Sequence, residues 1–240
     1  MMKLVAAALF LPVASFSSPI INGGFETGDL TGWSALGNVT VVTSFSGIGP
    51  QAGTFQAALS TGAGSVSNLQ AEVFLGLPPG ALGLGNAQIS VLKQQVNGSA
   101  GVLLNLFEDF LTNEAPTPIS DAHALAEIVF VDAFGDSLRV SLASTECSGC
   151  LHPGTHGFSF ETGYFTPYGS AYTIPFNPTT IGFVLADLGN DGVFHSTSLL
   201  LDSVAVSAPE PSTGCFVGFV CLAGVTCLLR LQQQNRPTVS

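Results

Sequence analysis

Near its start the chain reads Asn22-Gly23-Gly24-Phe25-Glu26-Thr27-Gly28-Asp29-Leu30-Thr31-Gly32-Trp33. Glycines recur every few residues in this stretch, and they allow a chain to bend closely around itself. Three large apolar residues, Phe25, Leu30 and Trp33, stand between the polar turns. We expect them to wedge into one end of a packed core, so the stretch predicts a tightly looped start of a compact domain.

Short β-branched or aromatic runs follow, separated by turns rich in Gly, Pro and Asn. Glycine makes up 28 and proline 14 of the 240 residues, which suits many tight turns, and helical periodicity is scarce. This pattern predicts an all-β fold, a single β-sandwich. The runs that we expect to be strands are 39–44, 54–60, 65–74, 88–96, 102–111, 122–134, 137–143, 180–186 and 198–206.

The first 17 residues have the layout of a secretory signal peptide. A basic start at Lys3 precedes an apolar stretch over 4–14, and the small residues Ser15 and Ser17 follow. An apolar stretch this short is typical of a signal peptide and not of a stable membrane span. We predict cleavage by signal peptidase after Ser17, with an uncleaved membrane anchor as the alternative.

The expected mature domain, residues 18–207, is strongly acidic. It is long enough for one domain with a sizeable core. It holds 15 acidic residues against Lys93 and Arg139 alone, a formal net charge of about −13. Such a surface repels nucleic acid and anionic lipid, so we exclude both as partners. Calcium or a neutral polymer remains a candidate ligand.

The tail, 208–240, combines Pro209-Glu210-Pro211 with an uncharged apolar run over 214–229 and a basic end at Arg230. The prolines cannot continue a helix upstream, so they mark a joint. As a helix the run spans roughly 24 Å, which is short of the roughly 30 Å hydrocarbon core of a bilayer. The tail therefore predicts a marginal membrane helix stopped by a cation.

This order of features resembles the PEP-CTERM sorting signal of bacterial surface proteins, with a sorting motif of Pro209, Glu210, Pro211 and Arg230. The resemblance implies recognition and processing by a membrane-embedded exosortase. It also implies a place at the cell surface, or in the extracellular matrix, of a Gram-negative bacterium that makes exopolysaccharide. The family has an arginine cluster where this chain has Arg230 alone, followed by Arg236. An ordinary terminal anchor is the alternative.

Three stretches of the expected domain resemble known jelly rolls. The stretch 22–33 resembles the opening of galactose-binding-like jelly rolls, which include cellulose- and xylan-binding modules. The run 199–206 resembles their last strand, and 110–118 resembles a signature of PEP-CTERM ectodomains. The resemblance implies a galactose-binding-like jelly roll over 18–207.

The same resemblance implies a structural calcium ion that joins the two ends of the domain. In such jelly rolls the ion takes a glutamate from the opening motif and an aspartate from the last strand, which here are Glu26 and Asp202. Backbone carbonyls near Gly24 and in the turn 49–53 would complete the shell of oxygens that calcium requires. The alternative is that Glu26 simply accepts hydrogen bonds from backbone amides.

Aromatic residues suggest where a sugar would bind. The tyrosines Tyr164, Tyr168 and Tyr172 lie within nine residues of one another, interrupted by glycine and proline. Exposed loop aromatics stack on sugar rings, but these three would equally well cover an open end of the core. Trp33 is a further stacking candidate, although its place next to Phe25 favours a core tryptophan.

Four acids, Glu108, Asp109, Glu114 and Asp121, invite a reading as catalytic carboxylates. Acid–base catalysis requires two of them to face each other across a cleft, and we expect a solvated acidic rim instead. The sequence has no Gly-x-Ser-x-Gly, His-Glu-x-x-His or Walker motif. We therefore predict a non-catalytic binder of extracellular polysaccharide. A matrix protein without a defined ligand and a hydrolase are the alternatives.

Cys147 and Cys150 stand close to His152 and His156. Export favours oxidation, and a tetrahedral zinc site usually takes its ligands from two separated segments. We therefore predict a disulfide between the two cysteines that pins a loop. Free thiols, or a metal or redox centre, are the alternatives.

Overall fold

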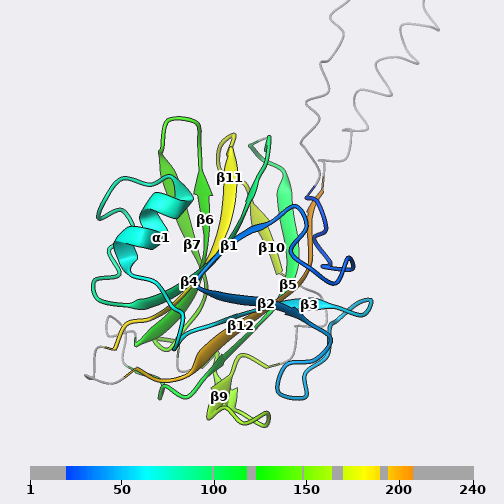
Figure 1. Ribbon diagram of the computed structural model, residues 1–240, viewed down its shortest axis with the longest axis vertical. Coiled ribbons are helices and arrows are strands. Elements are labelled where there is room, and N and C mark those ends of the chain that lie inside the picture. Colours follow the sequence, from blue (N-terminus) through cyan, green and yellow to red (C-terminus); the bar gives the residue numbers. More distant parts are fainter. Residues whose placement is uncertain are drawn as a thin grey trace, which may run out of the picture. The chain divides into compact units, whose positions relative to one another are not determined.

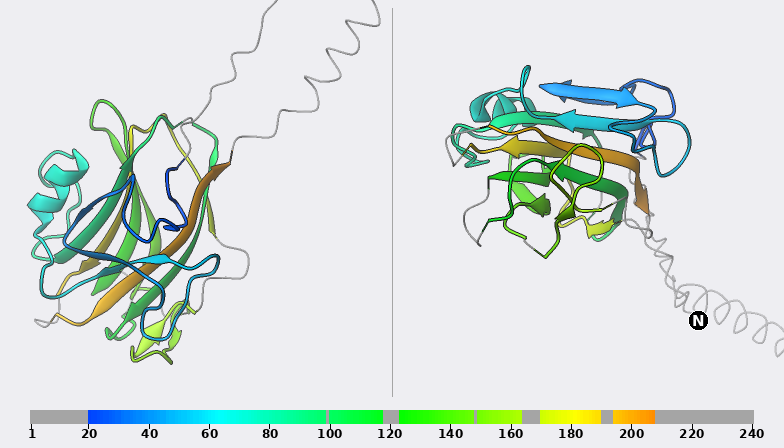
Figure 2. Two further views of the ribbon diagram at one scale, coloured as in Figure 1. Left: turned by 45° about the vertical axis from the view of Figure 1, so that its right-hand side comes forward. Right: turned by 90° about the horizontal axis from the view of Figure 1, so that it is seen from below.

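The computed structural model describes residues 20–98, 100–117, 123–147, 149–163, 170–189 and 194–207. They form two antiparallel β-sheets that pack face to face as a sandwich (Figures 1 and 2). The predicted signal peptide and the predicted sorting tail lie outside these residues. Among the described residues, no helix combines the length and the apolar character that crossing a membrane requires.

The first sheet has five strands, in the order β1 (Ser34–Leu36), β4 (Gln88–Gln95), β11 (Thr180–Asp187), β6 (Ala124–Val131) and β7 (Ser137–Ser144). The second sheet runs in the order β2 (Asn38–Val42), β3 (Gln56–Ser60), β12 (Thr197–Ser207), β5 (Leu103–Thr112), β9 (Phe160–Glu161) and β8 (His152–Pro153), with β10 (Ser170–Thr173) also paired to β5. From β3 to β6, and again from β11 to β12, the chain changes sheet at every strand, which is jelly-roll connectivity.

The opening stretch enters the core between the sheets, as its sequence predicts. Phe25 is completely buried, and Leu30 packs against the same cluster. The ring of Trp33 lies between those of Phe25 and Phe183, with centroid distances of 5.6 Å and 6.0 Å. Its indole N–H donates a hydrogen bond of 3.1 Å to the carbonyl of Asn22. Trp33 is therefore a satisfied core tryptophan.

The predicted strand 65–74 is wrong, because the segment forms the helix α1 (Asn68–Leu75). Ser67 and Gln70 make a reciprocal capping box at its start, and Gly76 closes its end at a φ of 83°. Leu69 and Val73, two of the apolar residues on which the strand prediction rested, are 54% and 68% exposed. The cap residues therefore decided the local structure, and the apolar alternation was misleading.

Helix α1 covers the outer face of the first sheet (Figure 1). Ala71 and Leu75 lie one helical turn apart and are both buried in this layer. Leu75 lies directly over Gly182 of β11, where a Cβ atom would come within 2.4 Å of its Cδ2. Only glycine at this position leaves room for the helix to pack so closely.

The other eight predicted strands are confirmed, with ends that differ by a few residues. The sequence did not predict β1, β8, β9 and β10, which have only two to four residues each. β1, β9 and β10 each pair with a longer strand, β4 or β5, and β8 pairs with β9. Their pairing depends on tertiary contact more than on their own residues.

Candidate functional site

Two acids occupy adjacent positions of β5 in the second sheet. Leu106 and Phe110 face the core between the sheets, so strand alternation points Glu108 inward and Asp109 outward. Asp109 is completely buried and Glu108 is half-buried. The expectation of a solvated acidic rim is therefore wrong for this pair. β5 pairs with β12 along one edge and with β9 and β10 along the other, and buried side chains pack on both of its faces.

The two oxygens of Glu108 differ sharply in their environment. Oε1 accepts hydrogen bonds from the hydroxyls of Ser170 and Tyr172, the latter at 3.3 Å. Oε2 is buried and has no hydrogen-bond partner. Burial raises the pKa of Glu108, although the two hydroxyl hydrogen bonds oppose that rise. Burial and the neighbouring carboxylate raise the pKa of Tyr172 to about 12, which keeps its hydroxyl a donor.

Glu108 borders a cavity of about 250 Å³. The other residues that line it are Leu142 and Ala143 of β7, Cys150 in the loop after β7, and Thr162 after β9. The cavity therefore opens between the edge of the first sheet and the edge of the second. Its wall combines one carboxylate and one hydroxyl with apolar surface, as ligand pockets commonly do.

Asp109 belongs to a separate polar cluster on the other face of β5. Its Oδ1 accepts a hydrogen bond of 3.2 Å from the hydroxyl of Thr162, while Oδ2 is buried without a partner. Burial raises the pKa of Asp109 to about 6, the hydrogen bond from Thr162 lowers it, and the charge of Glu161 raises it further. Glu161 in turn pairs with His156 at 3.2 Å.

The described acids Glu108 and Asp109 are not arranged as the acid–base pair that a hydrolase would need. The carboxyl groups of Glu108 and Asp109 point to opposite faces of one strand and do not face each other across a cleft. Glu114 lies near two histidines elsewhere in the fold. Asp121, the fourth acid considered from the sequence, lies outside the described residues.

The aromatic residues predicted to stack on a sugar do not all lie in one place. Trp33 is buried, with 7% of its surface exposed, and so presents no face for stacking. Tyr172 on β10 is half-buried and packs against the core, and its hydroxyl orients Glu108. Tyr164 and Tyr168 lie outside the described residues. Tyr172 therefore covers part of the core, which is the alternative role that the sequence leaves open for the tyrosines.

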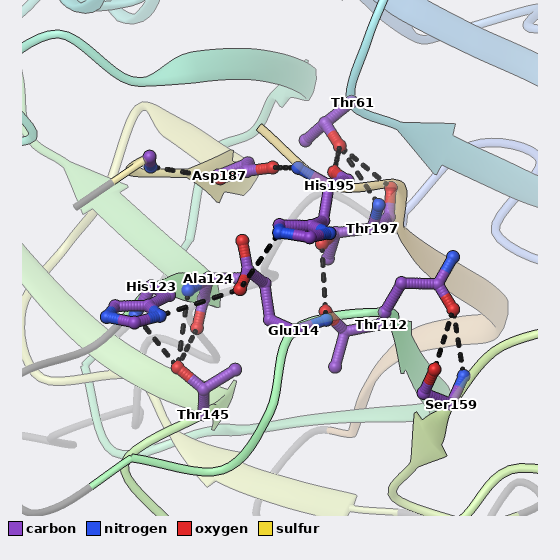
Figure 3. Close-up of polar contacts among 12 residues, drawn as sticks. Thr61, Thr112, Glu114, His123, Ala124, Thr145, Ser159, Asp187, His195 and Thr197 are labelled. Atoms are coloured by element: carbon purple, nitrogen blue, oxygen red, sulfur yellow. Dashed lines mark hydrogen bonds and ion pairs between the residues drawn. The ribbon is translucent and has the colours of Figure 1, made fainter. Parts of the chain in front are cut away.

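Figure 3 shows a cluster that sequence reasoning missed. The buried Oε2 of Glu114, after β5, lies 3.5 Å from Nδ1 of His123 and 4.0 Å from Nε2 of His195. The backbone N–H of His195 also donates a hydrogen bond of 2.7 Å to Asp187 at the end of β11. The cluster ties the ends of four strands together. Its members are far apart in the chain, so no local motif could have revealed it.

Glu26 and Asp202, the two predicted calcium ligands, meet at the same turn. Both carboxylate oxygens of Glu26 accept from the backbone N–H of Thr54 at 3.0 Å, and Oε1 also accepts from that of Phe55 at 3.1 Å. Oδ2 of Asp202 accepts from the backbone N–H of Ala52 at 2.8 Å. Backbone hydrogen bonding, the alternative to a calcium role, is therefore present at Glu26.

The same residues also fit calcium. Gly24 lies between the two acids, because a Cβ atom there would be 3.6 Å from Cγ of Glu26 and 3.9 Å from Oδ1 of Asp202. A carboxylate offers about four lone-pair sites, so the amides leave acceptor capacity on both side chains. Burial raises the pKa of Asp202, and hydrogen bonds from the turn oppose that rise. A cation here would offset this cost of burying charge.

Cys147 and Cys150 form a disulfide with a Cα–Cα distance of 5.2 Å, which is the pairing that the sequence predicts. Cys150 also lines the cavity beside Glu108, so the bond fixes part of the cavity wall. Within the described part of the chain, no three His, Cys, Asp or Glu residues are grouped to hold a metal ion. His152 and His156 therefore do not combine with other described residues of these types in such a centre.

No protein-family model matches the chain, and no curated protein matches it. Solved structures with a similar course of the chain include TmCBM61 in complex with β-1,4-galactotriose, at 15% identity and a TM-score of 0.42, covering 78% of this chain and 96% of that one. A cellulose-specific carbohydrate-binding module, CBM28, has 13% identity and a TM-score of 0.44, covering 79% and 95%. Caldicellulosiruptor saccharolyticus CBM27-1 in complex with mannohexaose has 13% identity and a TM-score of 0.43, covering 82% and 99%. At these values the likeness concerns the fold, and what this chain binds does not follow from it.

Proposed function

We propose that this chain is an exported cell-surface protein that binds extracellular polysaccharide without catalysing its breakdown. The observation that carries the proposal is the cavity of about 250 Å³ beside Glu108. It places the oriented carboxylate of Glu108, one oxygen of which has no hydrogen-bond partner, next to the apolar side chains of Leu142 and Ala143. Sugars combine hydroxyl donors with an apolar ring face, so they match both parts of this wall.

A binding role without catalysis agrees with the placement of the acids. Glu108, the acid at the cavity, has its neighbour Asp109 on the opposite face of the strand. Hydrolysis of a glycosidic bond generally uses two carboxyl groups on either side of that bond. A single carboxylate in a cavity is sufficient for hydrogen bonding to a sugar.

Export and sorting form the second part of the proposal and are motivated by the two chain ends. Residues 1–17 would be removed by signal peptidase, and the Pro209-Glu210-Pro211 joint would be recognised by an exosortase. The apolar run 214–229 would hold the chain in the membrane until that processing. The mature domain would then remain at the cell surface or in the extracellular matrix of a Gram-negative bacterium.

A structural calcium ion at Glu26 and Asp202, with the carbonyl of Gly24, completes the proposal. The ion would connect the opening stretch to β12, the last strand of the sandwich. The donor types agree with the preference of calcium for carboxylate and carbonyl oxygens. The ion would stabilise the fold, and the binding of a sugar in the cavity would not require it.

A matrix protein without a defined ligand is the second candidate, and one observation favours it. Tyr172 packs against the core instead of presenting its ring to solvent. A glycan array decides between the two candidates, using the wild type and Ala143→Leu, which fills the cavity. We expect the wild type to bind at least one neutral or cationic polysaccharide and Ala143→Leu to lose that binding.

Thermal melting would confirm that Ala143→Leu is folded. Asp136→Asn, at the exposed turn before β7, is the matched control and should bind as the wild type does. A folded wild type that binds no glycan on the array would leave the matrix role as the better account.

A further inference from the structure

The described side chains that line the cavity beside Glu108 offer hydrogen-bond acceptors only. Oε2 of Glu108 is an acceptor without a partner. The hydroxyl of Thr162 already donates to Asp109 and accepts from the backbone N–H of Phe110. The remaining lining residues are apolar or, like Cys150, part of the disulfide. A ligand that satisfies this wall must therefore bring donors.

The surroundings of Glu108 are negative as well. Asp109 is its neighbour in the chain, and Glu161 is close enough to Asp109 to raise the pKa of that residue. Among the described residues, His156 lowers the pKa of Asp109 through its charge, and this histidine pairs with Glu161. Nothing in the described surroundings neutralises Glu108, so a cationic donor would be favoured over a neutral one.

The two basic residues of the domain, Lys93 and Arg139, interact with groups that do not line the cavity. Lys93 donates to the carbonyl of Phe74 and lies 4.4 Å above its ring. Arg139 forms two hydrogen bonds with the carboxylate of Glu127, at 2.7 Å and 2.9 Å. Neither side chain takes part in the cavity wall. Neither of the two basic residues therefore offers Glu108 a positive charge, and a cationic ligand would supply one.

The size of the cavity limits that ligand. At about 250 Å³ it is smaller than the roughly 300–1,000 Å³ typical of sites for drug-sized molecules. It accommodates one sugar residue and not a segment of several. Leu142 and Ala143 offer apolar surface to one face of the ring while the carboxylate meets its polar edge.

We infer that this cavity binds a single amino-sugar residue, such as the end of a chain or a branch, with the sugar's ammonium group on Oε2 of Glu108. The inference rests on the proposed function and narrows it from polysaccharides in general to those with free amino groups. Ser170 and Tyr172 are positioning residues, because their hydroxyls hold Oε1 and so fix the direction of Oε2.

Three β-1,4-linked tetramers test this inference: those of glucosamine, N-acetylglucosamine and glucose. They share a backbone and differ only in the group at carbon 2, and acetylation removes the charge. Binding to the full-length protein would be measured by calorimetry at 0.15 M salt, which screens long-range attraction. We expect the glucosamine tetramer to bind at least tenfold more tightly than the other two.

Glu108→Gln is the decisive variant. It keeps the oxygen that accepts from Ser170 and Tyr172 and removes the charge, so the fold should be retained. We expect the tenfold preference for glucosamine to disappear in Glu108→Gln and to persist in Asp136→Asn, which removes an equal charge at the other end of β7. The second comparison separates a local ion pair from general attraction between a cationic sugar and an acidic protein.

Each contrary result has one meaning. If the acetylated or neutral tetramer binds as tightly as the glucosamine tetramer, the amino-sugar inference fails while polysaccharide binding stands. The inference fails equally if the preference survives in Glu108→Gln. If no tetramer binds but the array detects another glycan, the inference is again wrong and the proposed function remains. If neither assay detects binding, the proposed function itself fails.

Discussion

The carboxylate of Glu72 in α1 accepts a hydrogen bond of 2.9 Å from the backbone N–H of Leu82, which lies beyond the end of the helix. A second backbone N–H, that of Gly80, donates to the same carboxylate at 2.8 Å, and the amide of Asn68 donates at 2.9 Å. Glu72 is almost completely buried. One acid in the helix therefore holds the following loop, 78–84, against the outer face of the first sheet.

Glu72→Gln should destabilise the domain by about 3 kcal/mol, because one of the buried amides then faces an NH2 group. Burial raises the pKa of Glu72, but the hydrogen bonds from Gly80, Leu82 and Asn68 outweigh it, so the net pKa is lowered. The stabilisation is therefore present above the pKa of an unfolded glutamate, about 4.3, and is lost as pH falls through the folded pKa. Urea unfolding at pH 7 measures the loss, with Asp136→Asn as control. Equal midpoints for wild type and Glu72→Gln would contradict the role of Glu72.

Asp109→Asn should stabilise the domain at pH 7 and leave it unchanged at pH 4. The pKa of Asp109 rises from about 3.9 in the unfolded chain to about 6 in the fold. The protonated form is thus favoured in the fold, and wild-type stability falls as pH rises from about 4 to about 6. The difference at pH 7 should be about 2 kcal/mol. Unfolding midpoints measured across this pH range would disprove the role of Asp109 if both proteins gave parallel curves.

Calcium should raise the melting temperature if Glu26 and Asp202 hold the ion as proposed. Calcium at a hundred times its dissociation constant would stabilise the fold by about 2.7 kcal/mol. Melting would be recorded with calcium and with chelator for the wild type, Glu26→Gln and Asp202→Asn. We expect the full rise in melting temperature with calcium only for the wild type. A wild-type midpoint that ignores the chelator, together with no metal in the purified protein, would leave the turn amides as the only partners of Glu26.

Replacing Cys147 and Cys150 together by serine should cost about 2 kcal/mol, the small loop-closure entropy of a four-residue loop. The same variant should weaken sugar binding, because Cys150 lines the cavity beside Glu108. Mass spectrometry of the exported protein without reduction provides the first check. A mass that matches two free thiols would contradict the disulfide.

Glu210→Ala, or deletion of 214–240, should change the processing and location of the protein in a host that has an exosortase. The Pro209-Glu210-Pro211 joint before a short apolar run motivates this expectation. Mature mass and cell fractionation are the two measurements. Processing identical to that of the wild type in both variants would show that the joint is not a sorting signal.

The sequence alone determined the fold class and most of the strands. Short apolar runs between glycine and proline turns are local signals, so they reveal the strands that become β4, β5 and β12 without knowledge of their partners. Apolar residues next to tight turns likewise placed Phe25 and Trp33 in the core. The α1 segment shows the limit of this reasoning, because there the capping residues Ser67 and Gln70 mattered more than the alternation.

Tertiary structure alone decided which polar groups became buried and which met. Glu108 and Asp109 look like solvated acids in the sequence, and only the fold places β5 between paired strands and packs side chains on both of its faces. The same pairing brings Tyr172 to Glu108. The burial of a polar side chain depends on neighbours far along the chain, so its pKa, its partners and its cavity follow from the fold and not from the local sequence.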